Sequence, residues 1–273
     1  MVHLRVLLAI YAMQEASLRV FLPAGRLPEA TMDEGTSFTS LVRATLSDVL
    51  GTPGVADAAV DFDIGSLRPV YAEVLPPLDD TTDGVVVPAL VLLPRSPAPV
   101  PVGNGRLPTA DCSGAALLSC HPESLHDPAK ASGPAAAVVR VTRERLVELM
   151  LHTRAAMVLA GPVFSMTQLR QVYESMWGTS FDPSNFQKRM LGGGLVKRVP
   201  ADLSDPPVEL DTLTVVISDQ PPRAAAVQYT YGPDDLPALT TMTVWRDGVG
   251  RPAGLFVRGL SHEIDPTMDR PGA

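Results

Sequence analysis

The string SNFQKR, residues 184–189, gathers side chains that can hydrogen-bond to the edges of DNA bases. The Gln187 amide can donate to and accept from one adenine at the same time, and the Arg189 guanidinium can offer two parallel donors to a guanine. Lys188 suits a phosphate, where it acts as a charge, although the phase of a helix could exchange the roles of Lys188 and Arg189. These residue types point to double-stranded DNA, provided that a helix presents them together.

The segment before this string has the pattern of a well-delimited helix. Ser165 and Gln168 have the spacing of a capping box, in which each side chain would bond to the other residue's backbone amide. Gly178 stops the run, and the sequence predicts an amphipathic helix between these ends. Its apolar face consists of Met166, Leu169, Val172, Tyr173 and Met176.

A second helix is predicted after a short turn. Asp182 can cap it, and Pro183 can occupy its first position, where the missing N–H costs no hydrogen bond. Phe186 and Met190 face the core, the glycines at 192–194 end the helix, and the remaining arc is polar and basic. Two such helices fit a helix-turn-helix unit. A packed helical hairpin with a purely structural role has the same start and stop residues, so the pattern alone leaves that alternative open.

The string LRQVYESMWG…FDPSNFQKRMLGGGLV resembles the C-terminal winged helix-turn-helix of Nudix-related transcriptional regulators of the NrtR type. In that family a Q-x-x-Y-E segment precedes D-x-x-N-F-x-[RK]-[RK]-hydrophobic-L, and the wing carries G-R-P-x-x-L-[YF]. Residues 250–256, GRPAGLF, match the wing element. About fifty residues separate Val196 from Trp245, where the family has a short hairpin, so we expect an insertion at about 200–243. The helical element is matched by Gln168 or Gln171, Tyr173, Glu174, Asp182, Asn185, Phe186, Lys188, Arg189, Met190 and Leu191.

The resemblance implies a set of DNA contacts. Arg251 would contact a phosphate or the minor groove from the wing, and the alternative is an ordinary solvated arginine. The predicted DNA-binding residues are Ser184, Asn185, Gln187, Lys188, Arg189, Lys197 and Arg251.

The N-terminal part resembles the opening of a Nudix fold. Two apolar runs between His3 and Leu22 predict a β-hairpin, and a loop at 23–35 leads to a helix, capped by Ser37, that ends at Gly51. Strands at 70–75 and 85–93 extend the sheet, and Pro88 favours an edge position or a bulge for the second of them.

In the Nudix pattern G-x5-E-x7-R-E-U-x-E-E-x-G-U, where U is aliphatic, the loop and helix carry the catalytic carboxylates. With the last Gly on Gly51, Ala44 replaces the Arg, Thr45 replaces the first Glu, and Asp48 is the one acidic residue in the Glu pair. A shift of one residue recovers Arg43 but again supplies one carboxylate. Hydrolysis in that family needs several carboxylates to hold Mg²⁺, so we expect no catalytic residue, no enzyme activity and no metal.

The remaining organisation follows from composition and periodicity. Residues 94–134 are rich in Pro, Ala, Gly and Ser and predict loops. Thr142 is expected to cap a helix that reaches Leu159 and links the two parts, and apolar runs within 200–237 predict two strands of an enlarged wing, in a hairpin. The predicted fold class is α/β Nudix-like, a mixed sheet with helices, followed by a winged helix-turn-helix domain with an enlarged wing. The expected units are a degenerate Nudix-like domain at 1–140, a linker helix at 141–161, a winged helix-turn-helix domain at 162–260 and a flexible tail at 261–273.

Composition and charge agree with this organisation. The chain has 273 residues, 45% of them hydrophobic, and a net charge of −8. Residues 1–150 carry 11 basic and 17 acidic residues, a net of −6, whereas 164–200 carry five and two, a net of +3. Two cysteines and the absence of a long apolar run predict a cytoplasmic protein without a membrane span.

One cluster suggests a metal but has the wrong spacing. Cys112, Cys120, His121 and His126 form C-x7-C-H-x4-H, which matches no common zinc finger, and ordinary loop residues are the preferred interpretation.

Three hypotheses remain. The leading one is a homodimeric DNA-binding regulator whose inert Nudix-like domain senses a small molecule; the family implies an NAD-related metabolite such as ADP-ribose, or a sugar derivative. The second is a nucleoside diphosphate hydrolase that uses Glu29, Asp33 and Glu34. The third is a protein interaction module without DNA binding. The sequence assigns no residue to the effector and requires no cofactor.

Overall fold

The computed structural model describes a set of segments that cover both halves of the chain. They are residues 4–14, 16–32, 35–50, 60–61, 70–80, 84–93, 101–102, 105–106, 124–152, 155–161, 163–198, 208–210, 213–218, 227–231, 237–245 and 254–258.

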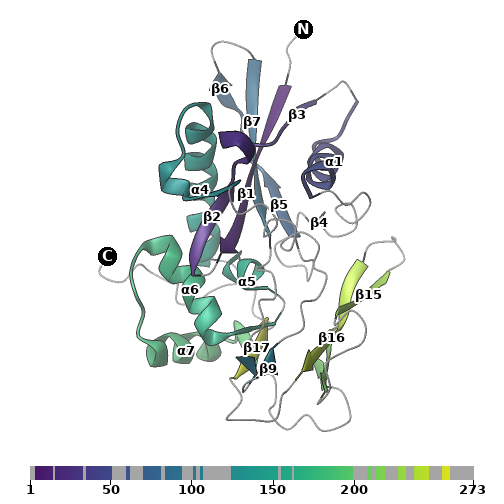
Figure 1. The fold of residues 1–273 in the computed structure, drawn as a ribbon, viewed down its shortest axis with the longest axis vertical. Helices are drawn as coiled ribbons and strands as arrows, with labels where there is room; N and C mark the ends of the chain where they lie inside the picture. The colour runs from purple at the N-terminus through teal and green to yellow at the C-terminus, as the bar shows by residue number, and fades with distance from the viewer. Residues whose placement is uncertain are drawn as a thin grey trace.

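A mixed β-sheet lies at the centre of the N-terminal half (Figure 1). Its path is β10-β2-β1-β7-β5-β4, while β3 pairs with β1 and β6 pairs with β7. The predicted opening hairpin is confirmed, because β1 and β2 pair antiparallel from Tyr11 opposite Val20 to Gln14 opposite Ser17. The strands are β1 (Leu4–Gln14), β2 (Ser17–Phe21), β3 (Glu29–Met32), β4 (Val60–Asp61), β5 (Val70–Val74), β6 (Leu78–Asp80), β7 (Gly84–Leu92) and β10 (Leu125–His126).

Pro88 was expected to mark an edge strand or a bulge, and the edge position is wrong. β7 is an inner strand that pairs parallel with β1, with Pro88 opposite Leu7, and antiparallel with β5 and β6. The Pro88 carbonyl accepts from the Leu75 amide at 2.9 Å, so the Pro88 nitrogen also faces that side, where the chain leaves β5 for β6. Because the missing N–H falls in this gap between two partner strands, the ladder to β1 stays intact.

Both faces of the sheet are covered, and β1 therefore reads as a continuous apolar run rather than an alternating one. Leu7, Ala9, Tyr11 and Met13 face one hydrophobic cluster, which contains α4 (Pro134–His152) and α5 (Ala155–Ala160). The alternate residues Val6, Leu8, Ile10 and Ala12 face a second cluster with α1 (Phe38–Leu50). Figure 1 shows α1 and α4 on opposite sides of the sheet. The helix predicted at 37–50 is α1, and the Ser37 hydroxyl accepts from the Ser40 amide at its start.

The predicted helix start at Thr142 is wrong. α4 begins eight residues earlier at Pro134, and Thr142 is buried in its middle. The Thr142 hydroxyl donates to the Val138 carbonyl at 2.7 Å, back along the helix, and lies 3.0 Å from the Tyr11 hydroxyl of β1. Thr142 thus connects α4 to β1. A threonine hydroxyl can bond in this way within a helix or can cap a helix start, so the residue type alone does not distinguish the two roles.

The winged helix unit follows α5, and its helices begin and end near the residues that the sequence predicts. It consists of β11 (Val163–Ser165), α6 (Met166–Trp177), α7 (Pro183–Gly192), β12 (Val196–Arg198) and β17 (Leu255–Arg258), and the three strands pair in the order β11-β17-β12. The sequence element Leu255–Phe256 thus lies in the wing sheet, as expected. Residues 250–253, with Arg251, lie outside the described segments.

The expected hairpin within 200–237 is wrong in its pairing. A separate four-stranded sheet has the order β13-β14-β16-β15, so β14 and β15 both pair with β16, parallel and antiparallel respectively. The sequence pattern did not predict β16, the strand that lies between β14 and β15 in this sheet. The strands are β13 (Val208–Leu210), β14 (Leu213–Ser218), β15 (Val227–Tyr231) and β16 (Pro237–Trp245). Within 94–134, where loops are predicted, the described elements are the short strand pair β8 (Pro101–Val102) and β9 (Gly105–Arg106), the edge strand β10 and a 3-10 turn at Pro128–Lys130; another such turn spans Pro23–Gly25.

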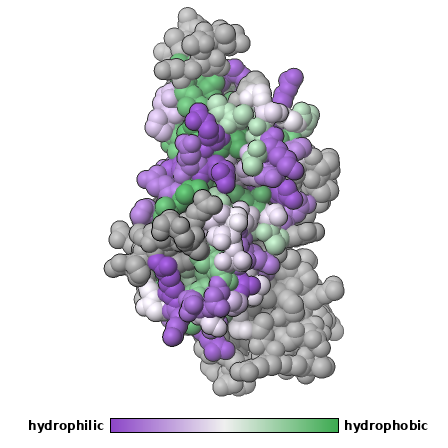
Figure 2. Space-filling model, turned by 90° about the vertical axis from the view of Figure 1, so that its left-hand side faces the viewer, coloured by the Kyte–Doolittle hydropathy of each residue, from purple (hydrophilic) through white to green (hydrophobic). Residues whose placement is uncertain are grey.

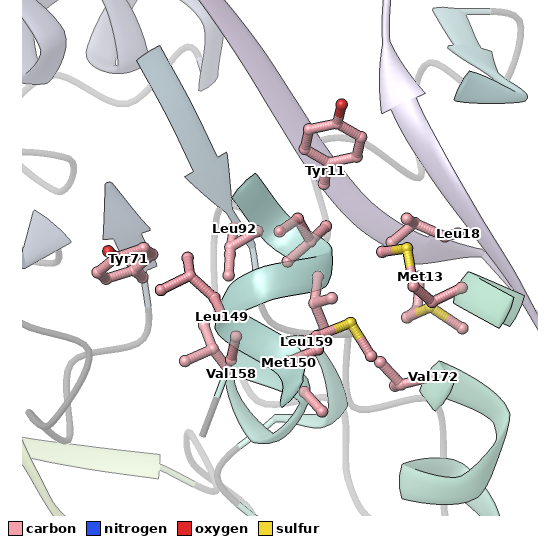
Figure 3. Packing of buried hydrophobic residues seen from close by; sticks show 14 of the residues in the cluster. Tyr11, Met13, Leu18, Tyr71, Leu92, Leu149, Met150, Val158, Leu159 and Val172 are labelled. Carbon is pink, nitrogen blue, oxygen red and sulfur yellow. The ribbon is translucent and has the colours of Figure 1, made fainter. Parts of the chain in front are cut away.

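One hydrophobic cluster joins the two halves. It includes Met13 and Leu18 of the β1–β2 hairpin, Met150 of α4, Leu159 of α5 and Val172 of α6, which Figure 3 shows converging on one another. The winged helix unit is therefore packed against the sheet and its helices through shared apolar side chains, rather than held by a single connecting helix.

Candidate nucleic-acid interface

Caps at both starts fix the two helices of the helix-turn-helix. The Ser165 hydroxyl accepts from the Gln168 amide at 3.2 Å, and the Gln168 side chain accepts from the Ser165 amide at 2.8 Å, which confirms the capping box. The Asp182 carboxylate accepts from the Asn185 amide at 2.8 Å, with Pro183 in the first turn of α7. Gly178 ends α6 with a φ of 63°, a conformation that favours glycine.

The turn between the helices is held by a contact that sequence reading missed. The Glu174 carboxylate accepts from the Phe181 amide at 2.9 Å and lies 3.4 Å from Arg170, one turn earlier on α6. The available signal was an acidic residue three positions before the end of the first helix, which a short turn follows. The contact fixes the entry of the chain into α7.

Aromatic side chains hold α7 against α6. Tyr173 lies 5.0 Å from Trp177 and 5.6 Å from Phe186, measured between ring centroids, and Phe181 lies 5.7 Å from both Trp177 and Phe186. Edge-on and tilted rings at these separations contribute about 0.5–1.5 kcal/mol per pair beyond their area burial. Phe186 and Met190 are buried, as predicted, so the rotation of α7 about its axis is set.

That rotation exposes most of the predicted contact residues. Ser184, Asn185, Gln187 and Lys188 are all exposed on α7. The face of the molecule in Figure 2 carries mostly hydrophilic side chains at the level where Figure 1 places α7. Their exposure leaves these side chains accessible to a ligand.

Arg189 is the exception to the expected solvent arc, because it is half-buried. Burial raises the pKa of the Tyr173 phenol above its ordinary value of 10, and the positive charge of Arg189 opposes part of that rise. Lys188 lies on the exposed side of α7, whereas Arg189 is partly covered. Both remain predicted contact residues, with Lys188 the better placed.

The wing adds exposed positive charge. Lys197 and Arg198 are exposed on β12, whose register with β17 sets Lys197 opposite Val257. The two acidic residues between 164 and 200 are both engaged locally, Glu174 at the turn and Asp182 at the cap. Glu174 also pairs with Arg170, so these two carboxylates are not the partners of Lys197 and Arg198.

The helix that resembles the Nudix motif presents little acidity. Thr45 of α1 is buried, and its hydroxyl donates to the Leu41 carbonyl at 2.8 Å, so it faces its own helix. Asp48 is exposed, as is Ala44. Glu29, invoked for the hydrolase alternative, pairs with Arg5 at 2.6 Å, and that hydrogen bond lowers the pKa of the Glu29 carboxyl. Asp33 and Glu34 lie outside the described segments.

The remaining candidate sites are only partly within the described residues. His126 lies on the edge strand β10, whereas Cys112, Cys120 and His121 fall outside the described segments. Among the described residues, no group of three or more His, Cys, Asp or Glu side chains gathers as a metal site would require. No described helix is long and apolar enough to cross a membrane.

Comparisons with known proteins agree with this geometry. Residues 157–202 match the family model of the NrtR DNA-binding winged helix domain. No curated protein matches the chain. The fold of the whole chain is similar to the crystal structure of Shewanella oneidensis NrtR complexed with a 27mer DNA, with a TM-score of 0.55, 13% sequence identity and coverage of 97% of this chain and 99% of that one.

Two further solved structures are similar at lower scores. Shewanella oneidensis NrtR in a second crystal structure has a TM-score of 0.49 and 15% identity, over 71% of this chain and 87% of that one. A MutT/nudix family protein from Enterococcus faecalis has a TM-score of 0.46 and 14% identity, over 94% and 88%. The expected fold class, a mixed α/β Nudix-like half followed by a winged helix, is confirmed, and so is the resemblance of residues 157–202 to the NrtR type.

Proposed function

We propose that this protein is a DNA-binding transcriptional regulator of the NrtR type. The observation that carries the proposal is the exposed row of Ser184, Gln187 and Lys188 on a helix whose rotation and start are fixed by packing and a cap. A recognition helix needs this combination, because it must enter the major groove with its contact side chains free and its scaffold rigid. The match of residues 157–202 supports the same proposal.

The electrostatics of the unit also support DNA as the partner. The chain as a whole has a net charge of −8, which disfavours indiscriminate adhesion to a polyanion. Lys188 on α7 and Lys197 and Arg198 on β12 nevertheless place exposed positive charge on the helix and strand that would flank a groove. Phosphate contacts of this kind supply affinity and orientation, whereas amide contacts such as those of Gln187 supply sequence preference.

We further propose that the N-terminal half binds a small effector and does not hydrolyse it. The family implies an NAD-related metabolite such as ADP-ribose, or a sugar derivative. Thr45 stands where the Nudix pattern has a catalytic carboxylate and keeps its hydroxyl on its own helix, which supports binding without turnover. The regulator would act as a homodimer in the cytoplasm, with each chain reading one half-site of an operator.

Selection of double-stranded DNA from a random library, followed by salt titration of binding, tests the proposal. We expect enrichment of a sequence that binds at least a thousandfold more tightly than random DNA at the same salt concentration. Binding that remains equal for all sequences, or that is absent at low salt, would leave the structural alternative of a packed helical hairpin.

A further inference from the structure

The outer side of α7 contains one apolar residue that no expected DNA contact includes. Leu191 is 38% exposed, and it is the exposed large hydrophobic side chain among the described residues. A single exposed leucine is unremarkable on most surfaces, because much of any protein surface is apolar. Leu191 matters because it lies on α7, among the predicted DNA contacts.

Leu191 lies in the middle of the contact row. At about 100° per residue, Gln187, Leu191, Ser184 and Lys188 fall within an arc of about 100°, and Leu191 is between the others. Arg189 falls about 140° from Ser184, in agreement with its half-buried position. A helix that presents Ser184 and Lys188 to DNA must therefore present Leu191 to it as well.

The end of α7 around Leu191 lies at the surface, because the next residue, Gly192, is exposed as well. A Cβ atom added at the next residue, Gly192, would meet nothing within 4 Å. The Gly193 amide bonds to the Arg189 carbonyl at 3.1 Å, so the end of α7 is fixed although it is open. Leu191 is thus held in place with its side chain directed to the same side as Lys188.

We propose that Leu191 is a specificity-determining residue that contacts the C5-methyl group of a thymine in the major groove. This inference rests on the proposed function. An apolar side chain in that groove meets one apolar base substituent, the thymine methyl, and distinguishes it from cytosine at the same place. Ser184 and Leu191 are about 10.5 Å apart along the helix axis, which corresponds to about three base-pair steps. The thymine should therefore lie about three base pairs from the base nearest Ser184.

Replacement of thymine by deoxyuridine tests the contact, because it removes only the methyl group and preserves base pairing. Each thymine of a selected duplex is replaced singly, and dissociation constants are measured by fluorescence anisotropy for the wild-type chain, Leu191→Ala, Leu191→Met and Lys188→Ala. For the wild-type chain we expect one position per half-site at which deoxyuridine weakens binding about fourfold, the effect of one buried methyl group.

The variants assign that effect to a residue. Leu191→Ala should weaken binding to the thymine duplex and abolish the difference between thymine and uracil at that position. Leu191→Met should keep the difference, and Lys188→Ala should weaken both duplexes by the same factor. Leu191 is 38% exposed, so its variants should remain folded at the temperature of the binding assay, which thermal unfolding checks.

Other results overturn the inference. It fails if the wild-type chain binds a selected sequence but no thymine is sensitive to loss of its methyl group, or if Leu191→Ala keeps that sensitivity. It also fails if Leu191→Ala changes only the mass found by light scattering, which would assign Leu191 to contact between copies of the chain. Failure to select any sequence overturns the proposed function as well, so the two failures are distinguishable.

Discussion

The backbone amide of Leu18, in the N-terminal hairpin, donates a hydrogen bond to the side-chain hydroxyl of Ser175 on the first helix of the helix-turn-helix. A second contact lies next to it, where the Arg143 guanidinium of α4 donates to the Met176 carbonyl at 3.4 Å. The sheet and α4 therefore both touch the end of α6 directly. A change in the N-terminal half can reach α6 without passing along the connecting residues.

The first prediction concerns coupling between an effector and DNA. A ligand of the N-terminal half should change operator affinity by about 1–3 kcal/mol, and DNA should change ligand affinity by the same amount. Ser175→Ala and Arg143→Ala should reduce this coupling by about 0.5–2 kcal/mol, because each removes one direct contact with α6. Operator affinities with and without a ligand shown by calorimetry to bind provide the measurement.

Arg140→Ala is the matched control for Arg143→Ala, since Arg140 is exposed one turn earlier on α4. Its coupling should equal that of the wild-type chain. Full coupling in the Ser175 and Arg143 variants would show that the signal travels through another route, such as α5.

The second prediction contrasts two buried tyrosines. The Tyr11 hydroxyl lies 3.0 Å from both the Val139 carbonyl and the Thr142 hydroxyl, whereas the equally buried Tyr173 hydroxyl has no hydrogen-bond partner in the described structure. Tyr11→Phe should therefore lower the free energy of unfolding by about 1–2 kcal/mol, and Tyr173→Phe should leave it unchanged or raise it. Urea unfolding of both variants gives the comparison, and equal losses would contradict it.

The helix caps and the contact of Thr142 with Tyr11 show how much of the fold can be predicted from the sequence. The capping box at Ser165, the Asp182–Pro183 start and the Gly178 stop were predictable, because each signal and its partner lie within a few residues. The pairing of Thr142 with Tyr11 was not, because it joins residues 131 positions apart and a threonine can serve in a cap or within a helix. Local chemistry therefore predicts the starts of α6 and α7, whereas the start of α4 and the contacts between elements depend on the rest of the fold.

The strands show the same division. The apolar runs at 70–75 and 85–93 predict strands correctly. Pro88 predicts an edge position or a bulge, because its partners, Leu7 on one side and the gap after Leu75 on the other, depend on the topology of the sheet. In the candidate site, helical spacing gave the exposed row on α7. The half-burial of Arg189 required the packing of α6, which no local pattern contains.

The third prediction is that ADP-ribose and similar diphosphates are not hydrolysed. Thr45 and Asp48 stand where the Nudix pattern has carboxylates, and Thr45 bonds to Leu41 within its own helix. Product release with Mg²⁺ or Mn²⁺ should match that of the Thr45→Ala/Asp48→Ala double variant. Metal-dependent turnover above this control would favour the hydrolase alternative, with Glu29 as the first residue to substitute.

The fourth prediction is a two-fold symmetric complex with DNA. One ten-residue recognition helix buries too little surface for specific affinity, so two chains should bind half-sites whose centres are about one or two helical turns apart, roughly 34 Å per turn. Light scattering should give the mass of a dimer at micromolar concentration, and footprinting should give a symmetric pattern. A monomer with an unsymmetrical footprint would exclude this arrangement.

The last prediction separates the polar residues of the interface by their chemistry. Gln187→Ala should cost about 1–3 kcal/mol on the selected operator and little on random DNA, since an amide reads a base edge. Lys197→Ala should weaken binding to both and lower the salt slope by about one unit, since a lysine on the wing meets a phosphate.

Arg189→Ala should differ from the other variants in its effect on stability. Arg189 is half-buried beside Tyr173, so its removal should lower the free energy of unfolding, whereas removal of the exposed Gln187 or Lys188 should not. Gel-shift measurements at two salt concentrations, together with urea unfolding, distinguish a contact residue from a packing residue. If Gln187→Ala, Lys188→Ala and Lys197→Ala all leave every DNA affinity unchanged, α6 and α7 form a structural hairpin and the chain does not read DNA through α7.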